Sequence, residues 1–135
     1  MRKLFRAPVF MMAFIALFIM TGQACAVDGY KDISPKEVKK MLDENASNIL
    51  LLDVRTPGEY KDEGHLKGSV LIPISDIEAR IGEIESYKDK EVIVYCRSGG
   101  RSSKVSNLLT GKGFKKIFNM SGGIGAWKSN GYAVE

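Results

Sequence analysis

Short apolar runs alternate with segments of helical periodicity along most of this chain of 135 residues. Such alternation is typical of an α/β domain in which mostly parallel strands are joined by helices. The expected strands are 49–54, 69–72, 91–95 and 117–120. The expected helices lie near 35–44, 57–62, 75–84, 101–112 and 124–129. Because no linker or repeat divides residues 27–135, we expect this segment to form a single domain.

Three of the expected helices begin with a recognisable cap. Ser34-Pro35-Lys36-Glu37 combines an N-cap serine, a proline at the first helical position and a glutamate that can close a capping box. Thr56-Pro57-Gly58-Glu59 repeats this arrangement. Ser75-Asp76-Ile77-Glu78 is expected to cap a third helix. These signals place the helix starts immediately after strands or turns.

The first 26 residues have the organisation of a secretory signal peptide. Arg2, Lys3 and Arg6 form a basic head, and 7–20 is an uncharged apolar run. Ala24-Cys25-Ala26 then has the small-x-small pattern of a signal-peptidase site. The apolar run is shorter than the roughly 20 residues that span a bilayer. We therefore predict cleavage after residue 26 and export to the periplasm; retention of the run as an anchor and lipid attachment at the cysteine remain alternatives.

Removal of this segment changes the charge of the chain. The whole chain has 20 basic and 16 acidic residues, but three of the basic residues belong to the predicted signal. The remaining 17 basic and 16 acidic residues nearly cancel, and no long basic run is present. We therefore expect no nucleic-acid partner and, after cleavage, no membrane contact.

Cleavage would also leave Cys96 as the one cysteine of the mature chain, because Cys25 departs with the signal. The segment Cys96-Arg97-Ser98-Gly99-Gly100-Arg101 follows an apolar strand and precedes a helix. Such a loop directs several backbone N–H groups and the helix N-terminus toward one point, and the two arginines add positive charge. This setting lowers the pKa of a thiol and favours a nucleophilic thiolate. The alternative is a small buried residue that ends a core strand.

Three motifs resemble those of the rhodanese sulfurtransferases. Cys96–Ser102 is similar to the active-site loop of that family. Residues 53–60 with 64–69 resemble its first signature, and 122–127 resembles its closing motif. The motifs occur in the family's order, and the similarity covers nearly all of residues 31–132.

The resemblance implies a five-stranded, mostly parallel sheet flanked by helices on both faces, with Cys96 at the mouth of a shallow pocket. It implies that Cys96 takes a sulfane sulfur from a small anionic donor such as thiosulfate. Cyanide or a thiol, including a protein thiol, would then accept this sulfur. Arg97 would hold the anionic end of the donor, while the loop of Ser98, Gly99, Gly100 and Arg101 would bind through its backbone N–H groups. For Arg101, bracing of the loop and direct contact with the donor remain alternatives.

The other polar residues of these motifs are interpreted as structural. Asp53 and Arg55 end a core strand, and Glu59 is placed to cap its helix or to pair with Arg55. His65 is expected to be a hydrogen-bonded turn residue, and Trp127 a core anchor. With one histidine and one cysteine left after cleavage, we expect no metal and no cofactor.

Two other functions compete with the sulfurtransferase. Phosphatases and arsenate reductases also combine a cysteine with an arginine, but their loops have five intervening residues, whereas four separate Cys96 from Arg101. A sulfur carrier or sensor that docks partner proteins would use the same persulfide. A disulfide oxidoreductase is disfavoured because the sequence has no Cys-x-x-Cys. The oligomeric state remains open.

Overall fold

A five-stranded sheet, parallel throughout, forms the centre of the computed structural model, which describes residues 29–135. The strands are Lys31–Ile33 (β1), Ile49–Asp53 (β2), Val70–Leu71 (β3), Glu91–Tyr95 (β4) and Lys116–Met120 (β5), in the order β1-β5-β4-β2-β3. The helices are Pro35–Asn45 (α1), Pro57–Asp62 (α2), Ile77–Arg80 (α3), Gly100–Gly111 (α4) and Gly123–Ser129 (α5), with 3₁₀ helices at Ala46–Asn48 and Ile81–Tyr87. The predicted α/β class, with five parallel strands, is confirmed. The predicted signal segment lies outside the described residues.

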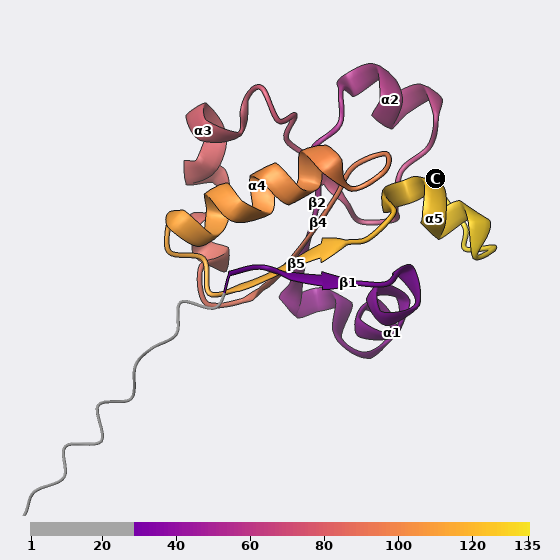
Figure 1. The fold of residues 1–135 in the computed structure, drawn as a ribbon, viewed down its shortest axis with the longest axis horizontal. Coiled ribbons are helices and arrows are strands. Elements are labelled where there is room, and N and C mark those ends of the chain that lie inside the picture. The colour runs from indigo at the N-terminus through magenta and orange to yellow at the C-terminus, as the bar shows by residue number, and fades with distance from the viewer. Residues whose placement is uncertain (1–28) are drawn as a thin grey trace, which may run out of the picture.

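Helices cover both faces of the sheet, and each face has its own apolar core. In Figure 1, α3 and α4 lie on one side of the sheet and α1 on the other. Successive residues of β2 alternate between the two cores, so that Leu50 and Leu52 pack toward α4, whereas Leu51 packs toward α1 and α5. This alternation follows from the two-residue period of a strand. Because both faces of the sheet are covered, β2 and β4 are apolar except for Asp53 at the end of β2 and Glu91 at the start of β4.

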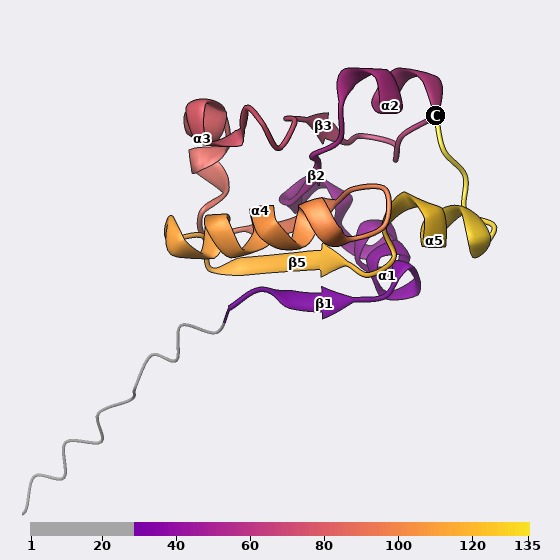
Figure 2. The ribbon, with the colours of Figure 1, turned by 45° about the horizontal axis from the view of Figure 1, so that its top comes forward.

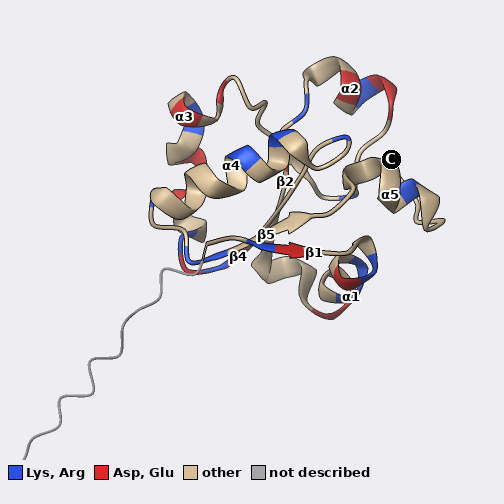
Figure 3. Cartoon of the chain, in the orientation of Figure 1, with Lys and Arg blue, Asp and Glu red and all other residues tan. Residues whose placement is uncertain are grey.

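The first two predicted helix caps are present. Ser34 and Glu37 form a reciprocal capping box at the start of α1, and Thr56 and Glu59 form another at the start of α2. Trp127 is buried as predicted, and its indole N–H donates to the carbonyl of Ala133 at 2.9 Å. Acidic and basic residues are mixed along α1, α2 and α3 (Figure 3).

Two parts of the fold differ from the sequence prediction. The edge strand β1 was not located, because two of its three residues are exposed and only Ile33 is buried. The third helix is shorter than predicted: α3 ends at Arg80, and the chain continues as a 3₁₀ helix. Asp76 provides no side-chain cap there, and Gly82 is a poor helix former. The predicted apolar contacts are nevertheless made, since Ile77 and Ile84 are buried in one cluster.

All five strands point the same way, so that their carboxyl ends share one edge of the sheet. The loops that follow β2 and β4 therefore lie next to each other, and this is the edge at which ligands bind in open parallel sheets. Figure 2 shows α2 and α5 beyond this edge, with α4 beginning between them. Among residues 29–135, no helix combines the length and the apolar character needed to cross a bilayer.

Candidate active site

The loop between β4 and α4 brings together the residues that were predicted to act. Cys96 follows the last residue of β4, and α4 begins at Gly100. Gly99 has a φ of 106°, in the left-handed region that favours glycine, and it is the N-cap residue of α4. The chain can therefore turn sharply from strand to helix within three residues. This turn keeps the cysteine close to the helix N-terminus.

The sulfur of Cys96 accepts a hydrogen bond from the backbone N–H of Gly99 at 3.1 Å. It also lies 3.3 Å from the hydroxyl oxygen of Ser102. Burial of the thiol, which is 1% exposed, raises its pKa. Hydrogen bonds from the Ser102 hydroxyl, and from backbone N–H groups that include those of Gly99 and Ser98, outweigh this effect. The pKa of Cys96 is therefore lowered, and the thiolate is favoured over its normal population.

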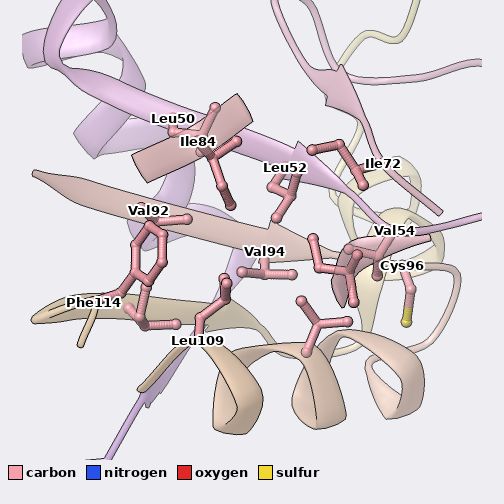
Figure 4. Packing of buried hydrophobic residues seen from close by; sticks show 13 residues of the cluster. Leu50, Leu52, Val54, Ile72, Ile84, Val92, Val94, Cys96, Leu109 and Phe114 are labelled. Carbon is pink, nitrogen blue, oxygen red and sulfur yellow. The ribbon is translucent and has the colours of Figure 1, made fainter. Parts of the chain in front are cut away.

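The cysteine occupies the end of the apolar cluster under α4. Figure 4 shows its sulfur directed away from the labelled apolar side chains, such as Val54 and Val94. The side chain is thus buried, as the alternative of a core cysteine would require, but its sulfur contacts hydrogen-bond donors. The arrangement suits a recessed anion better than an inert core residue.

The hydroxyl of Ser102 has two possible acceptors for its single proton. It donates to the carbonyl of Gly99 at 3.2 Å, and the Cys96 sulfur lies at nearly the same distance. A protonated thiol can donate to the hydroxyl oxygen, whereas a thiolate can only accept. The Gly99 carbonyl keeps a second donor, the backbone N–H of Ser103 at 3.0 Å. The Ser102 proton can therefore turn to the sulfur when Cys96 ionises, without leaving that carbonyl unpaired.

Ser102 was not among the predicted site residues. A signal for it was present, because side chains on the first turn of a helix tilt toward the N-terminus. A serine at the third helical position, on the buried side of α4, therefore points back to the loop. The sequence motif contained this residue, but the prediction assigned it no role.

The remaining predicted residues surround the sulfur in different ways. Arg97 and Ser98 are exposed, and the guanidinium of Arg97 has no hydrogen-bond or ion-pair partner within the described part of the chain. The backbone N–H of Ser98 contributes to the stabilisation of the thiolate. Gly100 is exposed and forms the first residue of α4. The loop thus has one uncommitted cation and several backbone donors.

Arg101 pairs with Glu59 across 42 residues of sequence. Its two terminal nitrogens donate to the two carboxylate oxygens of Glu59 at 2.7 and 2.6 Å. The prediction that Glu59 caps α2 is confirmed, but the alternative that its carboxylate pairs with Arg55 is wrong. Arg55 instead donates to the carboxylate of Asp53. Its hydrogen bond to Glu59 goes to the backbone carbonyl and not to the carboxylate. Both members of that second pair are fully buried.

The first turn of α5 is hydrogen-bonded to the backbone of the Cys96 loop. The backbone N–H of Ile124 donates to the carbonyl of Cys96 at 2.9 Å, and that of Gly125 donates to Arg97 at 3.1 Å. Gly123 has a φ of 58°, and a Cβ atom at this position would lie 2.4 Å from the carbonyl oxygen of Cys96. Only glycine allows this close approach of two backbone segments.

His65 is hydrogen-bonded, as predicted, but it lies in the irregular segment after α2, just before the turn at Lys67 and Gly68. Its Nδ1 is 3.2 Å from the carbonyl of Tyr60, and the two rings stack with centroids 3.8 Å apart. Its backbone exchanges two hydrogen bonds with Glu135, at 2.9 and 2.8 Å. Over residues 29–135, no three side chains of the histidine, cysteine, aspartate or glutamate type form a metal-binding group.

Comparisons with known proteins agree with this geometry. The Rhodanese family, described as a rhodanese-like domain, matches residues 34–130. A sulfurtransferase of Allochromatium vinosum is 36% identical over 90 residues, which cover 67% of this chain and 81% of that protein. YrkF of Bacillus subtilis, by its name a candidate sulfur carrier protein, is 33% identical over 96 residues and covers 71% of this chain, but only 50% of YrkF is matched.

A solved structure of a rhodanese-related protein from Thermoplasma volcanium superposes with a TM-score of 0.67 at 33% identity. The match covers 78% of this chain and 98% of that one. The family match spans nearly the whole described domain, and the fold and relatives agree with it. The chain therefore belongs to the rhodanese-like family, and its relatives support sulfur transfer as its general chemistry.

Proposed function

We propose that this protein is a sulfurtransferase that carries a sulfane sulfur on Cys96 as a persulfide. The donor is thiosulfate or a similar small anion, and the acceptor is cyanide or a thiol. The observation that carries this proposal is the environment of the Cys96 sulfur, which is recessed but accepts from the Gly99 N–H and lies beside the Ser102 hydroxyl. Such donors stabilise sulfur-centred negative charge at each stage of the reaction.

In the first step, the Cys96 thiolate attacks the outer sulfur of thiosulfate. A bond forms between the two sulfur atoms, and the sulfur–sulfur bond of the donor breaks. The electron pair of that bond leaves with sulfite, so that Cys96 becomes an anionic persulfide and the total charge is unchanged. Because the lowered pKa favours the thiolate, the step needs no separate general base.

In the second step, the acceptor attacks the outer sulfur of the persulfide. Cyanide leaves as thiocyanate, or a thiolate leaves as a new persulfide, and the electron pair of the broken bond returns to Cys96. A sulfur–sulfur bond is about 2 Å long, so the outer sulfur of the persulfide lies about 2 Å beyond the Sγ atom of Cys96. An acceptor can therefore reach the loaded site more easily than the resting thiol, which is 1% exposed.

Mass spectrometry of the intact protein tests the covalent step directly. Incubation with thiosulfate alone should add one sulfur atom to the described domain, and cyanide should then remove it. Cys96→Ser should show no adduct and no thiocyanate production. A wild-type protein that never gains sulfur from thiosulfate or from any small persulfide would contradict the proposal, as would near-normal turnover by the variant.

A substitution at Arg97 tests the proposed contact with the donor. Its guanidinium is exposed and unpaired within residues 29–135, so that it can hold an anionic donor at the loop. Arg97→Gln should raise KM for thiosulfate more than it lowers kcat. An unchanged KM would exclude this residue from donor binding.

A sulfur carrier is the second candidate function, and the similarity to YrkF favours it. A carrier would accept sulfur at Cys96 but would release it slowly to cyanide and rapidly to one protein thiol. Single-turnover measurements separate the two functions. Loading and unloading by small molecules at comparable rates supports the enzyme, whereas fast loading with negligible release to cyanide or small thiols supports the carrier.

We also propose that the chain is exported to the periplasm and cleaved after residue 26. The sequence of the first 26 residues supports this. N-terminal sequencing of the protein recovered from a periplasmic fraction should begin at Val27. Recovery of the intact N-terminus in a membrane fraction would support an anchored protein instead.

A further inference from the structure

The two arginines of the loop differ in what surrounds them. Arg101 is 32% exposed and Glu59 is 17% exposed, and they form a two-point ion pair with distances of 2.6 and 2.7 Å. Arg97 is exposed and has no such partner in the described residues. Paired guanidinium and carboxylate groups of this geometry are held by two parallel charge-assisted hydrogen bonds. The positive charge of Arg101 is therefore largely neutralised where it lies.

Arg101 nevertheless lies within electrostatic reach of the sulfur. The negative charge of the Cys96 thiolate contributes to the raised pKa of Arg101, after the larger contribution from Glu59. Glu59 itself is fixed in place by the cap of α2, where it also accepts from the backbone N–H of Thr56 at 2.9 Å. The carboxylate thus competes with any anion that approaches the loop.

We propose that Glu59 is a specificity-determining residue that withholds Arg101 from the sulfur donor. This inference rests on the proposed function and refines its donor class. With Arg101 withheld, the loop presents one uncommitted guanidinium, that of Arg97. A donor with a single negative charge fits this arrangement better than dianionic thiosulfate does. Small persulfides of the form R–S–S⁻, with an uncharged R group, belong to this class.

Sulfur transfer from such a donor balances without a further reactant. The Cys96 thiolate attacks the outer sulfur of R–S–S⁻, the donor bond breaks, and its electron pair leaves with R–S⁻. One persulfide anion and one thiolate are present before and after the step. Only one negative charge has to enter the loop beside the thiolate, whereas thiosulfate brings two.

The test compares an anionic and a neutral probe of the same thiol. Iodoacetate, an anion, and iodoacetamide, a neutral molecule, should both alkylate the Cys96 thiolate. Dividing the iodoacetate rate by the iodoacetamide rate cancels the thiolate fraction, so this ratio reports the local charge. Glu59→Gln removes the carboxylate charge but keeps an acceptor for the cap. The change should raise the iodoacetate-to-iodoacetamide ratio severalfold, the effect of removing one nearby unit charge in a water-like medium. It should also lower KM for thiosulfate by a similar factor, with little change for the persulfide of 2-mercaptoethanol.

The double variant Glu59→Gln/Arg101→Gln decides whether Arg101 is withheld. It replaces a neutral ion pair with a neutral pair, so that its alkylation ratio should equal that of the wild type. Glu83→Gln is the matched control, because Glu83 pairs with Arg80 on the surface. A ratio in the double variant that falls as far as in Arg97→Gln would overturn the proposal, since Arg101 would then already serve the anion. An unchanged ratio in Glu59→Gln would overturn it as well.

The alkylation readout does not depend on sulfur transfer. If the charge ratios behave as expected but no donor loads Cys96, the proposed function fails while the assignment of Glu59 stands. If loading occurs and the ratios do not change, the assignment fails alone. The rate with neutral iodoacetamide also shows whether each variant keeps its folded, reactive thiol.

Discussion

Replacing Ser102 with alanine removes the side-chain hydroxyl that lies 3.3 Å from the Cys96 sulfur. The serine is fully buried, and alanine fits the same space without its oxygen. The carbonyl of Gly99 loses the hydroxyl donor but keeps the backbone N–H of Ser103 at 3.0 Å. The loop should therefore keep its shape, and the effect should fall mainly on the thiolate.

The size of that effect follows from the charge of the acceptor. A hydrogen bond to a charged group contributes about 1.5 to 3 kcal/mol. Each 1.36 kcal/mol is a factor of ten in the ratio of thiolate to thiol. The Ser102→Ala variant should therefore raise the pKa of Cys96. At pH values below the wild-type pKa, the thiolate fraction of the variant should therefore be about 10- to 150-fold lower than that of the wild type.

The pH dependence of alkylation by iodoacetamide measures this change. The rate of the variant should rise with pH along a curve displaced to higher pH, and the two proteins should converge once both thiols are ionised. Ser106→Ala is the matched control: this serine is buried on the same helix, but its hydroxyl has no partner among the described residues. That substitution should leave the curve where it is.

An alkylation curve for Ser102→Ala that superposes on the wild-type curve would refute this reasoning. The backbone donors alone would then account for the thiolate. A rate that is lower at every pH, including the plateau, would also count against it, because a displaced loop rather than a lost hydrogen bond explains that pattern.

Three further substitutions test the supports of the site. Pairing with Arg101 lowers the pKa of Glu59 to about 2. The contribution of this ion pair to the stability of the folded state should therefore be complete above pH 4.5 and lost as the pH falls through 2. Urea unfolding should show Glu59→Gln less stable by about 1 to 2 kcal/mol at pH 6, allowing for solvent screening, but equal near pH 2. Gly123→Ala would place a Cβ atom 2.4 Å from the carbonyl oxygen of Cys96. Sulfur loading should therefore drop more than tenfold in single-turnover assays. Normal loading would show that α5 can shift to make room for the methyl group. Asp53→Ala leaves Arg55 buried without its carboxylate and should cost about 3 to 5 kcal/mol in urea unfolding; a loss below 1 kcal/mol would mean that water reaches the guanidinium.

Local patterns in the sequence predicted most of the fold. The apolar runs of β2 and β4 and the capping boxes at Ser34 and Thr56 are signals within a few residues, and the structure contains all of them. β1 gave no such signal, because it is three residues long and buries one side chain. Its place depends on pairing with β5, which lies more than 80 residues further along the chain.

The site was less predictable than the fold, for the same reason. The cysteine and its glycine loop are contiguous, so the sequence predicted where the sulfur would lie. The pairing of Arg101 with Glu59 joins two helix starts that meet only because β2 and β4 are neighbours in the sheet. Spacing along the chain pointed to Arg55 as the partner, and the parallel sheet brought a different arginine closer.

The recessed position of the Cys96 sulfur would matter in the oxidising periplasm to which we propose that the chain is exported. A bulky disulfide cannot bring its own sulfur atoms into line with a thiolate that is shielded by its loop, so mixed disulfides with other proteins should form slowly. Once loaded, the same cysteine offers its outer atom to slender nucleophiles. The burial that shields the unloaded thiol from disulfides would thus also limit which acceptors can take the sulfur.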